Sequence, residues 1–185
     1  MERLARGNNP ALAAVALAAV AAAACGTGGP AVRLSWIHGE DTVTAALPAS
    51  AVWCADQRWL EIVGAGTDTG VAFAVMHLDS VTLGAFPVVP VSTDTGPSSP
   101  SARMAVRWFS EHDMKNFEGI TGSLELSAAD SLLSGDFRGR LRAPVGEDSL
   151  ELAGGFRDVP LARDSLQCGS PGSDSLPADS ADSVD

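Results

Sequence analysis

Positive charge is scarce in this sequence. Twelve lysine and arginine residues are outnumbered by 23 aspartates and glutamates, which gives a formal net charge of −11 at pH 7, and Lys115 is the sole lysine. An acidic chain repels nucleic acids and anionic membrane surfaces. We therefore exclude nucleic acid as a partner.

The common motifs of catalytic and metal sites are also missing. There is no G-x-S-x-G nucleophile motif, and the three histidines, His38, His77 and His112, lie far apart without the spacing of zinc ligands. The glycine-rich segment 64–70 precedes a β-rich run instead of a helix, which argues against phosphate binding. These absences predict a non-catalytic protein with no metal and no cofactor, and an unrecognised hydrolase remains the third interpretation.

No hydrophobic run is long enough to span a membrane. The longest, Pro10 to Ala24, consists almost wholly of Ala, Val and Leu and follows Arg3 and Arg6. It stops after about fifteen residues, whereas a spanning helix needs about 20. A short basic segment followed by such a run is typical of a signal peptide, which we predict over residues 1–24.

A single cysteine ends this run. The segment Ala22-Ala23-Ala24-Cys25 resembles the lipobox of bacterial lipoproteins, although Ala22 stands where that motif usually has Leu. The resemblance implies that Cys25 is acylated, that residues 25–30 form a tether and that the protein is anchored in the bacterial cell envelope. Several acyl chains make such anchoring stable. The alternative is cleavage at an A-x-A site formed by Ala22 and Ala24, which would release a soluble periplasmic or secreted protein.

Cysteines are few, and their odd number needs an explanation in an exported protein. If Cys25 of the three cysteines is acylated, Cys54 and Cys168 remain as a pair. The close C-x-x-C spacing of redox-active pairs is absent, so we expect a structural disulfide. In the chain-entropy model a bond that closes so long a loop contributes about 4–5 kcal/mol.

Short apolar and β-branched runs, separated by Gly, Pro and Asp, predict one all-β domain over residues 31–168, with little helix beyond the signal peptide. Pro48 should end a strand, and Glu111 to Gly119 should form a short helical turn or an ordered loop. Residues 169–185, rich in Ser, Asp and Pro, should form a disordered acidic tail. Strands are expected over residues 31–37, 42–47, 51–54, 58–63, 71–78 (the most buried), within 81–91 (an edge strand) and 104–109.

The final third permits a prediction of register. If residues 122–126, 132–141 and 150–156 pair in sequence, Phe137 lies opposite Gly154 and Phe156 lies opposite Gly135, so each ring covers a glycine. The expected fold is an antiparallel meander that forms a β-sandwich or a small barrel. One face then carries Leu124, Leu126, Leu133, Phe137, Leu141, Leu150, Leu152 and Phe156, and the other carries Glu125, Arg138, Arg140, Arg142, Glu151 and Arg157, with Arg140 opposite Glu151.

The four tryptophans, Trp36, Trp53, Trp59 and Trp108, admit two interpretations. They pack in the core or cover a barrel mouth, or they form a stacking surface that contacts a glycan or an apolar ligand.

The layout after the signal resembles that of the small mycobacterial lipoprotein antigens. Cys54 lies in an early strand, Cys168 lies at the end of the domain, and Gly64-Ala65-Gly66 lies between them, although the acidic tail and the tryptophans depart from the pattern. The resemblance implies a non-catalytic surface lipoprotein. We therefore expect an envelope-anchored protein with a structural or interaction role, whose partners are a membrane, through its lipid, and an envelope protein, glycan or lipid. The alternative is a carrier of an apolar small molecule or lipid.

Overall fold

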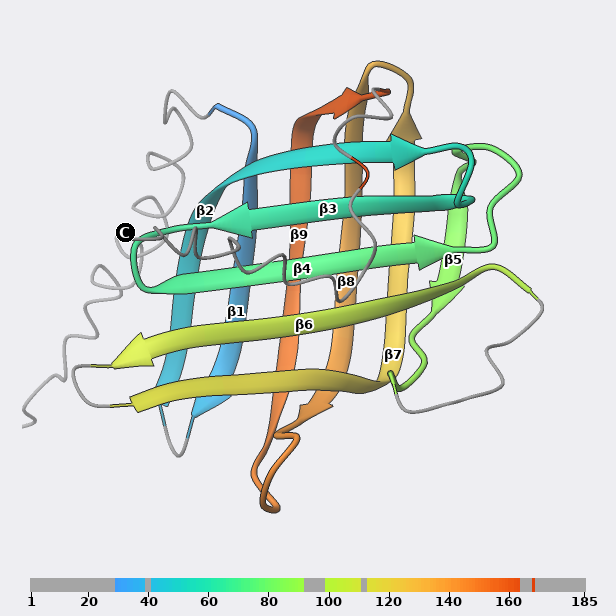
Figure 1. Cartoon of the computed structure of the whole chain (residues 1–185). Helices are drawn as coiled ribbons and strands as arrows, with labels where there is room; N and C mark the ends of the chain where they lie inside the picture. Colours follow the sequence, from blue (N-terminus) through green and yellow to red (C-terminus); the bar gives the residue numbers. More distant parts are fainter. Residues whose placement is uncertain (1–28, 39–40, 92–98, 111–112, 164–167, 169–185) are drawn as a thin grey trace, which may run out of the picture.

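The computed structural model describes residues 29–38, 41–91, 99–110, 113–163 and 168, and most of these lie in β-strands (Figure 1). The described part contains no helix, which confirms the all-β prediction. The strands are β1 (Ala31–His38), β2 (Asp41–Cys54), β3 (Trp59–Ala65), β4 (Thr69–Met76), β5 (Gly84–Pro87), β6 (Ser101–Ser110), β7 (Asp113–Ala129), β8 (Leu132–Arg142) and β9 (Ser149–Ala162).

These strands form a closed barrel. Eight of them pair antiparallel in the order β1, β2, β3, β4, β6, β7, β8, β9, and β9 returns to pair with β1. The short strand β5 pairs with β7 outside this cycle, as expected of an edge strand, although it covers only part of the predicted run 81–91. The fold is thus the small barrel rather than the sandwich, and closure pairs both edges of each barrel strand.

Two strands bend and join two groups of strands that cross at a steep angle (Figure 1). The first is β2, which pairs with β1 up to Pro48 and with β3 from Ala49 onward. The prediction that Pro48 ends a strand is therefore wrong. Pro48 is exposed and lies at the point where β2 changes partner. Because the pairing with β1 ends there, the missing N–H of Pro48 does not interrupt a continuous row of backbone hydrogen bonds.

The second bent strand is β7, and its first half corrects another prediction. Residues 113–119 form neither a helical turn nor a loop, because they pair with β6 from Asp113 opposite Ser110 to Glu118 opposite Ala105. Strand β6 provides the backbone hydrogen bonds that make this segment a strand, although its polar local sequence did not indicate one. The strand bends next to Gly119, where an added Cβ would lie 2.6 Å from Cγ of Met104, and the register with β8 shifts between Gly119 and Thr121.

The meander of β7, β8 and β9 has the predicted register. Phe137 pairs with Gly154 and Phe156 pairs with Gly135, and an added Cβ on Gly154 would lie 2.7 Å from Cζ of Phe137. All eight side chains predicted for the dry face are buried. The predicted wet face is exposed: Glu125, Arg138, Arg140, Arg142, Glu151 and Arg157.

Aromatic side chains occupy the barrel interior. The ring of Phe73, on the strand predicted to be the most buried, lies 4.5 Å from that of Phe137 and 6.4 Å from that of Phe156, between ring centroids. A second aromatic group stacks within the same core, with 5.5 Å between Trp36 and Trp108 and 5.0 Å between Trp108 and Phe117. Side chains therefore fill the barrel, as is usual for eight strands.

Several predictions concern residues that the structure does not describe. The signal peptide over 1–24, the acylation of Cys25 and the acidic tail over 169–185 lie outside the described ranges. Within those ranges, no helix has the length and apolar character needed to cross a membrane.

Candidate functional site

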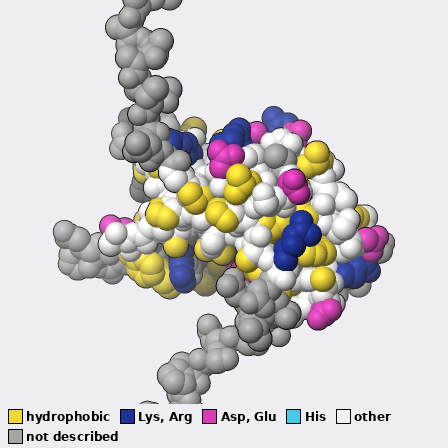
Figure 2. All heavy atoms as spheres, turned by 90° about the horizontal axis from the view of Figure 1, so that it is seen from above, with side chains coloured by type: hydrophobic (Ala, Val, Ile, Leu, Met, Phe, Trp, Pro, Cys, Tyr) yellow, Lys and Arg dark blue, Asp and Glu magenta, His cyan; other side chains and the backbone are white. Residues whose placement is uncertain are grey.

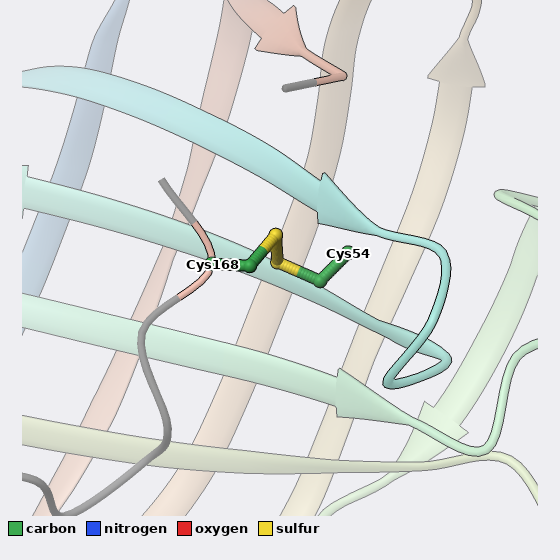
Figure 3. Close-up of a disulfide and its surroundings, with 2 residues drawn as sticks. All are labelled: Cys54 and Cys168. Atoms are coloured by element: carbon green, nitrogen blue, oxygen red, sulfur yellow. A yellow bond between two sulfur atoms is a disulfide. The ribbon is translucent and has the colours of Figure 1, made fainter. Parts of the chain in front are cut away.

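The disulfide joins Cys54 to Cys168, as predicted, over a sequence separation of 114 residues (Figure 3). Cys54 is 2% exposed and lies with Val52 and Trp59 in a small apolar cluster that is separate from the barrel interior. The partly buried Ala162 and Cys168 pack against this cluster. The bond therefore ties the chain beyond β9 to the end of β2 and has a structural position.

The tryptophans do not converge on one surface. Trp36 and Trp108 stack inside the barrel, and Trp53 packs against the same interior core. Trp59 lies outside, buried next to Cys54. Core packing therefore accounts for three of the four, and the four indoles do not share one surface of the described structure.

The outer face of β3, β4 and β6 holds buried polar groups that sequence reasoning missed. Nε1 of Trp59, Oγ of Ser101 and Nε of Arg103 are buried and have no hydrogen-bond partner among the described residues. Glu61 lies in the same cross-strand row as Arg103, with Ala74 between them, and burial raises the pKa of its carboxyl group. A glutamate inside the apolar run Trp59-Leu60-Glu61-Ile62-Val63 was the available signal for this position.

A depression of about 540 Å³ lies on the opposite outer face. Its location follows from two cross-strand rows of side chains that run over β2, β1, β9, β8 and β7. The first row is Thr44, Ser35, Ala153, Arg138 and Ser123, and the second includes Glu151, Arg140 and Thr121. A second depression, of about 480 Å³, shares Ser35 and Ala153 with the first and extends to Arg33 and Gly155. We call the two together the outer groove.

Small and polar side chains line the outer groove. Ala153 lies at the centre of both depressions, with the hydroxyl groups of Ser35, Thr42 and Thr121 and the exposed side chain of Ile37 around it. Next to Ala153, the ion pair of Asp136 and Arg157 covers Gly155. Ser35 Oγ donates a hydrogen bond to the carbonyl oxygen of Ala153 at 3.4 Å. The groove is therefore an open surface that offers both hydrogen-bonding and apolar groups.

Arginines give this groove a positive charge on an otherwise acidic protein. No described residue forms an ion pair or hydrogen bond with the side chain of Arg33 or Arg138. Among the described residues, Arg140 has one long contact, 4.0 Å from its Nε to Oε1 of Glu151. By contrast, Arg157 is paired, with 2.7 Å between its Nη2 and Oδ1 of Asp136. The sequence placed Arg138 and Arg140 on this face but not Arg33 or the hydroxyl groups.

The end of the barrel that carries the β7–β8 turn has a different character. There, acidic and basic side chains are interspersed with hydrophobic ones (Figure 2). Neither sign of charge dominates the described residues in this view.

The remaining sequence motifs gather into no site. The glycine-rich segment 64–70 is the hairpin between β3 and β4, in which Gly66 N donates to Thr69 O at 2.8 Å. His77 is exposed after β4, and His38 ends β1, whereas His112 lies outside the described residues. Among the described residues, no three of the His, Cys, Asp and Glu side chains gather closely enough to hold a metal ion.

Comparison with known proteins adds no relative, since no family model, curated protein or solved structure matches this chain significantly.

Proposed function

We propose that this protein is an exported, lipid-anchored and non-catalytic interaction protein of the bacterial cell envelope, and that its barrel is a rigid scaffold that binds a partner on the outer groove. The observation that carries the proposal is the contrast between a filled interior and an open outer groove with unpaired arginines. The lipobox-like segment ending at Cys25 supports the anchor.

The filled interior favours this role over carriage of an apolar molecule within the barrel. The rings of Phe73, Phe137 and Phe156 occupy the space that a ligand would need. Displacing them would forfeit the burial of large aromatic side chains, and a Phe truncated in a core typically costs about 3–5 kcal/mol.

The chemistry of the groove favours binding over hydrolysis. Its lining contains one carboxylate, Glu151, and neither histidine nor cysteine. Ser35, the hydroxyl nearest the centre, donates to a backbone carbonyl and has no base beside it in the described structure. Nucleophilic catalysis needs a base within hydrogen-bond reach of the nucleophile.

Membrane fractionation and intact-mass measurement of the full chain, expressed in a bacterial host that processes lipoproteins, test the anchor. We expect the wild type in the membrane fraction, with a mass that begins at Cys25 and includes acyl chains. The Cys25→Ala variant should move to the soluble fraction. An unmodified wild-type mass, or a membrane-bound Cys25→Ala variant, contradicts the proposal.

A further inference from the structure

We infer that the outer groove binds an acidic glycan whose sugar units carry carboxylate groups. This inference rests on the proposed function and names the class of partner. The groove is the part of the described surface where unpaired arginines and aligned hydroxyl groups occur together.

The arginines account for recognition of carboxylates. The side chains of Arg138 and Arg140 project from the same face of β8, two residues apart, and Arg33 lies across β9 on β1. A guanidinium group binds a carboxylate through two parallel hydrogen bonds, and such charge-assisted bonds are about twice as strong as neutral ones. Because Arg33 and Arg138 have no partner among the described residues, binding an anion breaks no existing ion pair at either side chain.

The other groups in the groove favour a sugar over an acidic peptide. Ser35, Thr42 and Thr121 both donate and accept hydrogen bonds, and Glu151 accepts them. Sugar hydroxyl groups can donate to the Glu151 carboxylate, whereas the side chains of an acidic peptide have no donor to offer it.

The spacing of the rows agrees with this choice. Side chains in a cross-strand row repeat at the strand spacing of about 4.8 Å, which is close to the length of one pyranose unit. A glycan laid along the row from Thr44 to Ser123 therefore meets one side chain per sugar. The side chains on one face of an extended peptide repeat every second residue, at about 6.7 Å, and fall out of step with the row.

The floor of the groove sets the strength of binding. The small side chain of Ala153 permits a close approach of the ligand, whereas Asp136 and Arg157 cover the neighbouring Gly155. The indole of Trp36 packs in the core beneath and offers no stacking face. Binding should therefore depend mainly on exposed charges, whose interactions are screened by salt over about 10 Å at 0.1 M. The affinity should fall as salt concentration rises.

The test is calorimetric titration of the full chain, at low salt, with three probes: a hexamer of galacturonate, the neutral maltohexaose and hexaglutamate. We expect the galacturonate hexamer to bind at least about tenfold more tightly than either of the others. The Arg138→Gln variant should weaken it by about tenfold or more, as the loss of one charge-assisted contact predicts. Arg107→Gln, the same change at an exposed position on β6, should alter the affinity by less than about threefold.

Three results would overturn the inference. Equal or tighter binding of hexaglutamate assigns the groove to acidic peptides, and an equal loss in Arg107→Gln shows non-specific charge attraction. Absence of galacturonate binding by a folded wild type also rejects the glycan. Membrane anchoring and Cys25 acylation are measured in a separate experiment. A negative titration therefore leaves the proposed anchor unaffected, and a protein that is not anchored can still be titrated with the three probes. Thermal unfolding of each variant verifies that both exposed arginines were replaced without loss of the fold.

Discussion

Cross-strand glycines make room for the large rings of the core. Phe137 covers Gly154 and Phe156 covers Gly135 on neighbouring strands, and these two rings surround Phe73. Glycine is required at these positions by close approach, since no positive φ occurs at either one. The packing of the interior therefore depends on the absence of two methyl groups.

Replacing Gly154 by Ala should destabilise the barrel by about 1–3 kcal/mol, as expected for overpacking. The new Cβ would lie 2.1 Å from the carbonyl oxygen of Arg33, a backbone atom that has little freedom to move. Urea unfolding measures the change. Gly70→Ala is the matched control, because its nearest neighbours lie 3.8 Å away, and a loss of stability as large in this control would refute the explanation.

Glu61 should make stability depend on pH. Its folded-state pKa is raised by burial, so between its ordinary value of 4.5 and the raised value the folded state holds more protons than the unfolded state. Stability contributed by this group is therefore complete below pH 4.5 and is lost as pH rises through the folded-state pKa. The charged residue nearest to Glu61 in its cross-strand row is Arg103, which lies on β6 beyond Ala74.

Glu61→Gln removes this ionisation. The variant should be more stable than the wild type at pH 7, and the difference should shrink towards pH 4. Urea unfolding at both pH values measures the difference, with Glu147→Gln in the exposed β8–β9 loop as control. A variant less stable than the wild type at pH 7 would mean that ionised Glu61 makes a favourable contact, and the prediction would be wrong.

The bent strands are the elements that turn a meander into a barrel. Both β2 and β7 pair with one neighbour in their first half and with another in their second half. Local sequence marks the bends with Pro48 and Gly119 but does not distinguish a bend from an end. The choice depends on whether a neighbouring strand continues the hydrogen-bond ladder, which is a property of the assembled sheet.

The stacked aromatic group joins β1 to two strands with which it does not pair, β6 and β7. Trp36 belongs to β1, whereas Trp108 and Phe117 belong to β6 and β7. A double-mutant cycle of Trp36→Ala and Trp108→Ala should give a coupling energy of about 0.5–1.5 kcal/mol. The same cycle with Trp36→Ala and Trp59→Ala should give none, because Trp59 lies in the separate outer cluster. Equal coupling in both cycles would show a global effect instead of a contact.

For the whole molecule, the disulfide adds stability to a sheet that is already closed. The pairing of β9 with β1 closes the barrel without it, and Cys54 and Cys168 pack with an outer cluster. Reduction should therefore lower the free energy of unfolding by about 2–5 kcal/mol and leave the β-sheet signal in far-ultraviolet circular dichroism. Urea unfolding with and without reductant measures this, and the Cys54→Ala, Cys168→Ala double variant should not respond to reductant. Loss of the β-sheet signal on reduction alone would show that closure depends on the bond.

Much of the local arrangement was predictable from sequence, and little of the site was. Period-two alternation predicted the dry and wet faces of β8 and β9, and the ring-over-glycine register, because neighbouring residues of a strand face opposite sides. The same reasoning found Arg138 and Arg140 but not their proximity to Arg33 and Ser35, which lie far away in the chain. It also missed that the tryptophans separate between the interior and the outer face.

The sequence alone determined the strand character, the acidic balance and the faces of the last meander, because each follows from residue type and local period. It predicted the pairing of Cys54 with Cys168 only on the condition that Cys25 is acylated, and the structure contains that disulfide. The tertiary structure decided that the meander closes, that β2 and β7 bend instead of ending, and that an arginine-bearing groove forms across five strands. These features require non-local pairing, whose geometry depends on the twist and closure of the whole sheet and not on any one segment.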